Sequence, residues 1–208
     1  MTKAIIFDFD GTIADSFEVF ARALEKILKR KQTLSDGEIA NLRNSSFQEV
    51  IKKLDVKKWQ LPILVIKGRK EMGKHMDSVN VFDGIPEALK ELFEQGYKLY
   101  IVSSNDGRSI ANFLDKNQLG AYITRTQANI GLFGKVKTLN RLRKAEGFSA
   151  DECIYVGDET RDIEAAAKAH MKCIAVGWGF SNPNKLRSYK PSIVVNNPKD
   201  LARSLNLS

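Results

Sequence analysis

The chain is poor in the residue types that build several common kinds of site. Its 208 residues include two cysteines and two histidines, and neither pair has the spacing of metal ligands. Cys153 and Cys173 each lie in an apolar run, where cysteine usually acts as a small buried hydrophobe. His75 and His170 have no partner residue at a ligand spacing. We therefore expect reduced, inert thiols and no metal site built from cysteine or histidine.

Long apolar runs are also missing. No segment approaches the roughly 20 apolar residues of a membrane helix. The N-terminus has a single lysine before a short apolar run and no small-residue cleavage site, which is unlike a signal peptide. The sequence contains no P-loop, no H-E-x-x-H, no paired C-x-x-C and no complete dinucleotide-binding glycine fingerprint. A cytoplasmic protein without a membrane partner is the resulting expectation.

The residues that are present are typical of a soluble globular protein, with 43% apolar and 28% charged. The length suits one core with an appendage, or at most two small domains. The net charge of +8 is concentrated between Ser16 and Val81, where 14 lysines and arginines face 8 acidic residues. A basic surface of this kind attracts phosphorylated small molecules or nucleic acid.

Apolar runs and helical periodicities alternate along most of the chain. This alternation predicts an α/β fold, with a parallel sheet covered by helices on both faces. Between Ser16 and Val81 the pattern is helical throughout and predicts no strand, with Ser35 and Glu38 forming a capping box. The predicted strands are 4–7, 98–102, 153–156, 173–176 and 192–195. The predicted helices begin near residues 17, 35, 46, 63, 86, 109, 136, 163 and 198.

Two carboxylates follow the first apolar run. Asp8 and Asp10 share a face while the chain stays extended, and Phe9 between them turns toward the interior. They would lie at the carboxyl ends of the strands, where open α/β sheets bind ligands. Such close carboxylates repel each other unless a cation or a proton intervenes. An Asp-Gly pair after a strand is also a common turn, so Asp10-Gly11 alone has an ordinary structural reading.

Three further groups of polar residues lie where strands end or helices begin. Ser103, Ser104 and Asn105 follow a buried strand and precede a helix, an arrangement that offers donors to an anion. Lysines at 135 and 137 follow the turn from Gly131 to Gly134. Asp158 and Asp162 have the i, i+4 spacing that places two side chains on one helix face. Each group alone could equally be a cap or a solvated surface.

The four groups together resemble the haloacid dehalogenase (HAD) superfamily. F-D-F-D-G-T at residues 7–12 matches its first signature, and Ser103 matches the serine or threonine that ends its second. Lys135 lies 23 residues before Asp158, about the spacing of the third signature, and G-D-x-x-x-D at 157–162 matches the fourth. The chain looks most like the phosphoglycolate phosphatase-like branch. The resemblance implies a Rossmann-like core at residues 1–15 and 82–208 with an all-helical cap at 16–81.

The resemblance also implies roles for these residues. Asp8 would be the nucleophile and Asp10 the general acid and base of a phosphatase that forms an aspartyl-phosphate on a small phosphate monoester. Mg2+ would be held by Asp8, the carbonyl of Asp10, and Asp158, because oxygen ligands suit this ion. Asp162 would position the lysine or a metal-bound water. The phosphate-binding residues would be Ser103, Ser104, Asn105 and Lys135, with Lys137 as a competitor because the prolines that follow this lysine in many relatives are absent.

Other functions remain open at this stage. A phosphomutase of the phosphoglucomutase type shares all four signatures, whereas dehalogenases lack the second aspartate, here Asp10. The basic segment suggests a nucleic-acid 3'-phosphatase, although no aromatic residues are interleaved there for base stacking. A catalytically silent interaction protein on the same fold is the third alternative. Arg43 is a candidate contact of the cap with substrate, and the sequence leaves the physiological substrate and the oligomeric state unassigned.

Overall fold

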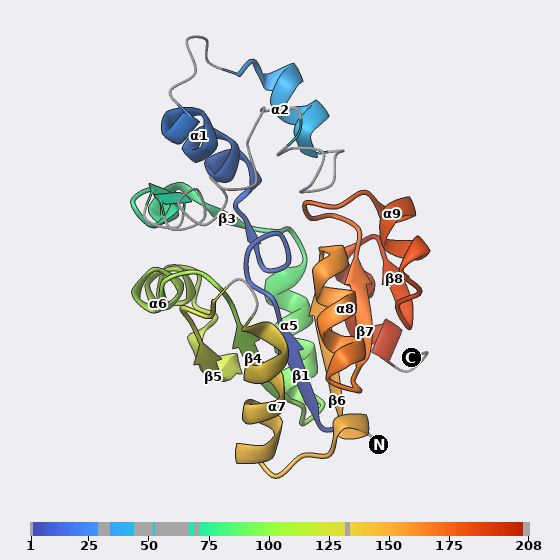
Figure 1. The fold of residues 1–208 in the computed structure, drawn as a ribbon. Coiled ribbons are helices and arrows are strands. Elements are labelled where there is room, and N and C mark those ends of the chain that lie inside the picture. Colours follow the sequence, from blue (N-terminus) through green and yellow to red (C-terminus); the bar gives the residue numbers. More distant parts are fainter. Residues whose placement is uncertain are drawn as a thin grey trace.

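The computed structural model describes residues 2–28, 34–43, 52, 67–68, 71–131 and 134–205. The helix expected from Ser46 to Leu54 lies outside these ranges except for residue 52, whereas residues 67–68 and 71–76 of the helix expected from Ile63 to Met76 are described, and 67–68 and 71–73 are helical. Figure 1 shows a central sheet flanked by helices, with further helices above one end of the sheet.

The sheet has six strands in the order β5-β4-β1-β6-β7-β8, and every pairing is parallel. β1 lies in the interior of the sheet, where Ile6 is opposite both Tyr100 of β4 and Tyr155 of β6. All four residues of β1 are buried, as expected for a strand covered on both faces. The parallel α/β architecture predicted from the sequence is therefore confirmed. The strands are β1 (Ala4–Phe7), β4 (Lys98–Val102), β5 (Ile123–Gln127), β6 (Cys153–Gly157), β7 (Lys172–Val176) and β8 (Ile193–Val195).

Two helical layers cover the sheet because alternate residues of each strand point to opposite faces. Ile5 and Phe7 pack with α5 (Ile85–Glu94), α6 (Gly107–Lys116) and α10 (Leu201–Ser204). Ala4 and Ile6 pack with α7 (Lys135–Ala145), α8 (Thr160–Lys168) and α9 (Pro183–Ser188). Figure 1 shows α7 and α8 in front of the sheet and α5 behind it. Short 3-10 helices span Gly120–Tyr122, Ala150–Glu152 and Pro198–Asp200.

Two helices of the segment from Ser16 to Val81 lie beyond the carboxyl ends of the strands (Figure 1). α1 (Phe17–Leu28) and α2 (Asp36–Arg43) share a small apolar cluster that includes Phe17, Leu24 and Ile39. The Ser35–Glu38 capping box is present, with Ser35 N donating to Glu38 Oε2 at 2.8 Å. Phe180 packs edge-on against Phe17, with ring centroids 5.0 Å apart, and so connects this cluster to the loop after β7. No helix within the described ranges is both long and apolar enough to cross a membrane.

The prediction that this segment contains no strand is wrong at its end. β3 (Asn80–Val81) pairs antiparallel with β2 (Ala14–Asp15), and a 3-10 helix, η2 (Met76–Ser78), precedes it. Two-residue strands are too short to show an alternating pattern in the sequence. The pair brings the two ends of the segment together, where the chain leaves the loop after β1 and where it returns to α5.

Candidate active site

The loop after β1 places Asp8 at the edge of the sheet. The Asp8 amide donates to Val156 O at 2.8 Å, which continues the pairing of β1 with β6 for one more residue. Phe9 is fully buried, and its ring packs edge-on against Phe113 with centroids 5.1 Å apart, as the alternation of side chains predicts. Gly11 then adopts a φ of +77°, a backbone conformation that favours glycine. The chain turns sharply here and leaves the Asp8 carboxylate at the strand end.

Lys135, the first residue of α7, forms an ion pair with Asp8. Its Nζ lies 2.9 Å from Asp8 Oδ2 and also contacts Asp162. The Lys135 side chain is 11% exposed, whereas Lys137 is exposed at the surface. Burial raises the pKa of Asp8, and the Lys135 ammonium opposes this shift. Of the two lysines that the sequence left open, the structure brings Lys135 to the carboxylates.

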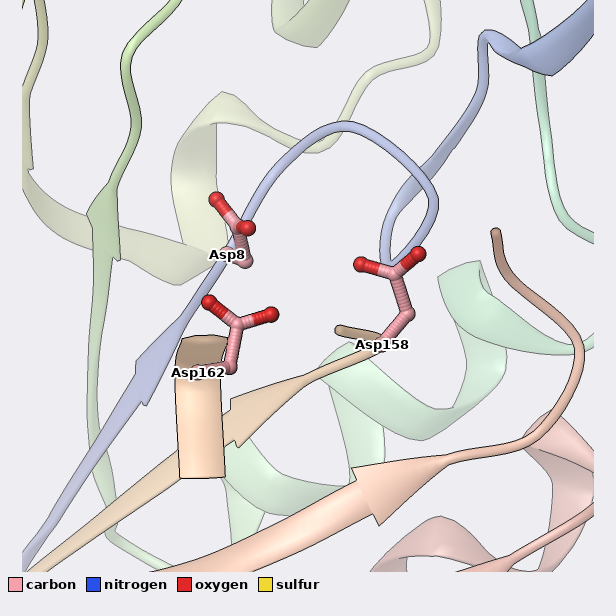
Figure 2. Close-up of side chains that lie close together, drawn as sticks. All are labelled: Asp8, Asp158 and Asp162. Atoms are coloured by element: carbon pink, nitrogen blue, oxygen red, sulfur yellow. The ribbon is translucent and has the colours of Figure 1, made fainter. Parts of the chain in front are cut away.

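Asp8, Asp158 and Asp162 form a compact group of buried carboxylates. One oxygen from each lies within 4.8 Å of the others. Figure 2 shows their carboxylates around a common space, with Asp8 at the end of β1, Asp158 just after β6 and Asp162 on α8. Burial raises the pKa of Asp158 well above its usual range, and the negative charges of Glu159 and Asp162 raise it further. Crowded oxygen ligands of this kind fit Mg2+, because a bound cation offsets both the burial and the repulsion.

Asp158 is fixed in place by its neighbours. Its carboxylate accepts a hydrogen bond from Phe180 N at 2.6 Å and one from Thr12 Oγ1 at 3.3 Å. Gly179 packs so closely that a Cβ atom there would lie 2.3 Å from Asp158 Cβ and from Gly11 O. The loops after β1, β6 and β7 therefore meet tightly around this carboxylate.

Asp10 has hydrogen-bond partners different from those of Asp8. Ser16 Oγ donates to Asp10 Oδ1 at 2.8 Å, and Asn105 Nδ2 lies 3.2 Å from Asp10 Oδ2. Burial raises the pKa of Asp10 to about 6, the charge of Asp8 adds to the shift, and the hydrogen bonds from Ser16 and Asn105 oppose it. A carboxyl group with such a pKa can both give and take a proton near neutral pH.

The loop after β4 lies beside Asp10. Ser103 is buried, and its Oγ accepts a hydrogen bond from Asn105 N at 3.0 Å. Ser104 is half-buried in the same loop, and the side chain of Asp106 caps α6 by accepting from Ser109 N at 3.0 Å. The sequence predicted backbone donors from Ser104 and Asn105; the structure adds a side-chain role, because Asn105 connects this loop to Asp10.

Four residues around these carboxylates were not singled out from the sequence. Thr12 and Ser16 donate to Asp158 and Asp10, and they lie within or just after the first signature. Glu159 is buried and caps α8, and Arg161 forms an ion pair with it. All four are close in sequence to predicted aspartates, and that proximity is the one signal that could have suggested them. Arg43 ends α2, and its side chain lies outside the described part of the chain.

Comparison with known proteins agrees with this geometry. The model of the family described as haloacid dehalogenase-like hydrolase matches residues 5–176. A phosphoglycolate phosphatase of Synechococcus elongatus is 29% identical over 205 residues, covering 98% of this chain and 97% of that protein. A 5'-nucleotidase of Pseudomonas aeruginosa is 27% identical over 198 residues, covering 90% and 88%. The crystal structure of a predicted phosphatase from Clostridium acetobutylicum superposes with a TM-score of 0.82 at 20% identity, covering all of both chains, and so shares the fold.

Proposed function

The chain belongs to the haloacid dehalogenase-like hydrolase family, and from this premise we propose that it is a Mg2+-dependent phosphatase of a small phosphorylated metabolite. The contact of Lys135 with Asp8 at the carboxyl end of β1 is the observation that carries the proposal. It pairs a carboxylate nucleophile with a cation that can balance the charge of a phosphoryl group. The relatives named phosphoglycolate phosphatase and 5'-nucleotidase support a phosphate monoester as substrate.

In the first step Asp8 Oδ attacks phosphorus and the bond from phosphorus to the leaving oxygen breaks. Lys135 holds Asp8 from one side, and Ser103 with the loop amides after β4 would bind the phosphoryl oxygens. The leaving oxygen takes its proton from Asp10, whose carboxyl group Ser16 and Asn105 hold in place. The product of this step is an aspartyl-phosphate on Asp8 and a free alcohol.

In the second step a water molecule gives its proton to Asp10 and attacks phosphorus. The bond from phosphorus to Asp8 breaks, inorganic phosphate leaves and the Asp8 carboxylate is restored. The same carboxyl group thus acts first as acid and then as base, so each turnover leaves it protonated again.

Asp8, Asp158 and the carbonyl of Asp10 would hold Mg2+, and Asp162 would position Lys135. The bound ion supplies positive charge that reduces repulsion between the Asp8 carboxylate and the anionic phosphoryl group. Thr12 and the Phe180 amide keep Asp158 oriented for this task.

We also propose that the chain is divided into a core of residues 1–15 and 82–208 and a cap of residues 16–81. The placement of α1 and α2 beyond the strand ends and the pairing of β2 with β3 at the boundary support this division. A cap in this position would close over the carboxyl ends of the strands, exclude water and select the substrate.

The proposal is tested by measuring p-nitrophenol release from p-nitrophenyl phosphate with Mg2+ and with EDTA. We expect turnover that requires Mg2+ and is lost in Asp8→Asn, which keeps the size of the side chain but removes the nucleophile. A positive result is followed by a panel that includes phosphoglycolate and nucleoside 5'-monophosphates. A wild-type protein that hydrolyses none of these compounds would contradict the proposal and favour a mutase or a silent binding protein.

A further inference from the structure

Arg161 occupies a position that helix electrostatics disfavour. It lies in the first turn of α8, between Thr160 and Asp162. The N-terminal end of a helix carries partial positive charge, so a cation there is repelled. Arg161 forms an ion pair with Glu159, the buried N-cap residue of the same helix. The cation is therefore held at this end by a neighbouring carboxylate, against the helix dipole.

The guanidinium of Arg161 has a donor without a hydrogen-bond partner in the described part of the chain. Its Nε is buried and has no hydrogen-bond partner within the described ranges, although the side chain as a whole is 41% exposed. A guanidinium offers five donors in a planar fork that fits carboxylates and phosphates. A buried donor without a partner is uncommon in a folded protein and often marks a place where another group binds.

Arg161 directly precedes Asp162 in the first turn of α8, and Lys135 joins Asp162 to Asp8, so this end of α8 lies beside the reacting carboxylates. Burial raises the pKa of Asp8 and of Asp10, and the positive charge of Arg161 opposes both shifts. Lys135 is already engaged with Asp8 and Asp162, whereas Arg161 retains donors beyond its contact with Glu159. An anionic group on a substrate would be repelled by the many carboxylates here unless a cation received it.

We infer that Arg161 is a specificity residue that binds a second anionic group of the substrate, adjacent to the phosphoryl group that is transferred. The inference rests on the proposed phosphatase function and extends it to the substrate class. A carboxylate and a second phosphoryl group share the required chemistry, because both accept two parallel hydrogen bonds from a guanidinium. The substrate is thus a phosphate compound with an additional negative charge close to phosphorus.

The test compares release of inorganic phosphate from phosphoglycolate, pyrophosphate and ethyl phosphate in the presence of Mg2+. Phosphoglycolate carries a neighbouring carboxylate, pyrophosphate a neighbouring phosphoryl group, and ethyl phosphate neither. We expect Arg161→Gln to lower kcat/KM for at least one of the two doubly anionic substrates by about 10- to 100-fold more than for ethyl phosphate. The substrate with the larger selective loss identifies the group that Arg161 binds.

Two further variants serve as controls for this comparison. Arg161→Gln leaves Glu159 buried and unpaired, so the double variant Glu159→Gln/Arg161→Gln removes both charges and should show the same selective loss. Arg203→Gln makes the same change of net charge on α10, which packs against α5 and β8. We expect this variant to change kcat/KM by the same factor for all three substrates.

An equal loss on all three substrates in the Arg161 variants would overturn the inference. A wild-type enzyme that hydrolyses ethyl phosphate as efficiently as both other compounds would overturn it too. Failure of the phosphatase function itself is distinguishable, because the wild type would then release phosphate from none of the three.

Discussion

Lys135 is the residue on which the arrangement of the site depends. Its Nζ contacts both Asp8 and Asp162, so one cation offsets two buried carboxylates. Loss of this cation leaves the Asp8 and Asp162 carboxylates without compensation. It also removes the positive charge that would stabilise the transferring phosphoryl group.

We therefore expect Lys135→Met to lower kcat by about 10²- to 10³-fold, the range typical of removing one donor to developing charge. Lys137→Met is the matched control, because Lys137 is two residues away on the same helix and exposed. Steady-state hydrolysis of p-nitrophenyl phosphate by the two variants gives the comparison. Equal losses in both, or a larger loss in the Lys137 variant, would contradict the assignment of Lys135.

Gly179 tests the close packing around Asp158. A Cβ atom at this position would lie 2.3 Å from Asp158 Cβ and from the carbonyl of Gly11, so Gly179→Ala must displace the loops. We expect a loss of about 1–3 kcal/mol in the free energy of unfolding, as is common for overpacked sites. Gly131→Ala is the control, since nothing lies within 4 Å of a Cβ there. Urea unfolding of both variants measures the difference, and unchanged stability in Gly179→Ala would refute the packing argument.

The site residues that the sequence predicted follow strands, whereas the residues that it missed depend on how loops fold. Asp8, Ser103 and Asp158 follow buried strands, and parallel strands bring their carboxyl ends to one edge, so their proximity follows from the pattern. Thr12 and Arg161 act through contacts that depend on the path of a loop and on side-chain direction. Hydrophobic periodicity in the sequence predicts neither the path of a loop nor the direction of a side chain.

At the level of elements, ion pairs connect α1 to residues 71–75, which precede η2 and β3. Glu71 contacts Lys26 of α1, and Lys74 Nζ lies 2.9 Å from Glu71 Oε2. His75 Nε2 lies 3.7 Å from the same carboxylate. The hydrogen bonds from Lys26 and then Lys74 lower the pKa of Glu71 to about 2 from an ordinary value of 4.5.

This shift gives stability a dependence on pH with a defined sign. The folded state favours the Glu71 carboxylate, so the contribution is fully present above pH 4.5 and is lost as the pH falls toward about 2. We expect Glu71→Gln to destabilise the protein more at about pH 6 than at about pH 3. Glu18→Gln, which removes a 67% exposed carboxylate 3.8 Å from Arg22, should have little effect at either pH. Urea unfolding at both pH values makes the measurement, and a larger effect at the lower pH would contradict it.

Most of the elements that the sequence did not predict are short. α9 has six residues and β2 and β3 have two each, too few to show a hydrophobic period. Five of the six strands of the sheet are mostly apolar runs and were predicted to within one or two residues. β5 was the exception, since its residues are only partly buried and its sequence I-T-R-T-Q contains a single apolar side chain.

At the scale of the whole molecule, the proposed metal site would make stability depend on Mg2+. Asp8, Asp158 and Asp162 repel one another without a cation, and Mg2+ bound there would stabilise the folded state by mass action. We expect the melting temperature of the wild type to rise with Mg2+. At a Mg2+ concentration 100 times the Kd, the free energy of unfolding should increase by about 2.7 kcal/mol. Asp158→Asn removes one ligand and should abolish most of this rise. Thermal unfolding with Mg2+ and with EDTA tests the expectation, and an undiminished rise in the variant would place the metal elsewhere.

The proposed mechanism requires Asp8 to carry the phosphoryl group during turnover. The most direct test is to mix each protein with p-nitrophenyl phosphate labelled on phosphorus, quench with acid and count the label on the protein. Asp10→Asn should accumulate label, because p-nitrophenolate leaves without a proton from residue 10 while hydrolysis of the aspartyl-phosphate still requires a base there. We expect one labelled site in Asp10→Asn and none when Asp8→Asn is added. Label that persists in the double variant, or turnover by Asp8→Asn alone, would contradict it.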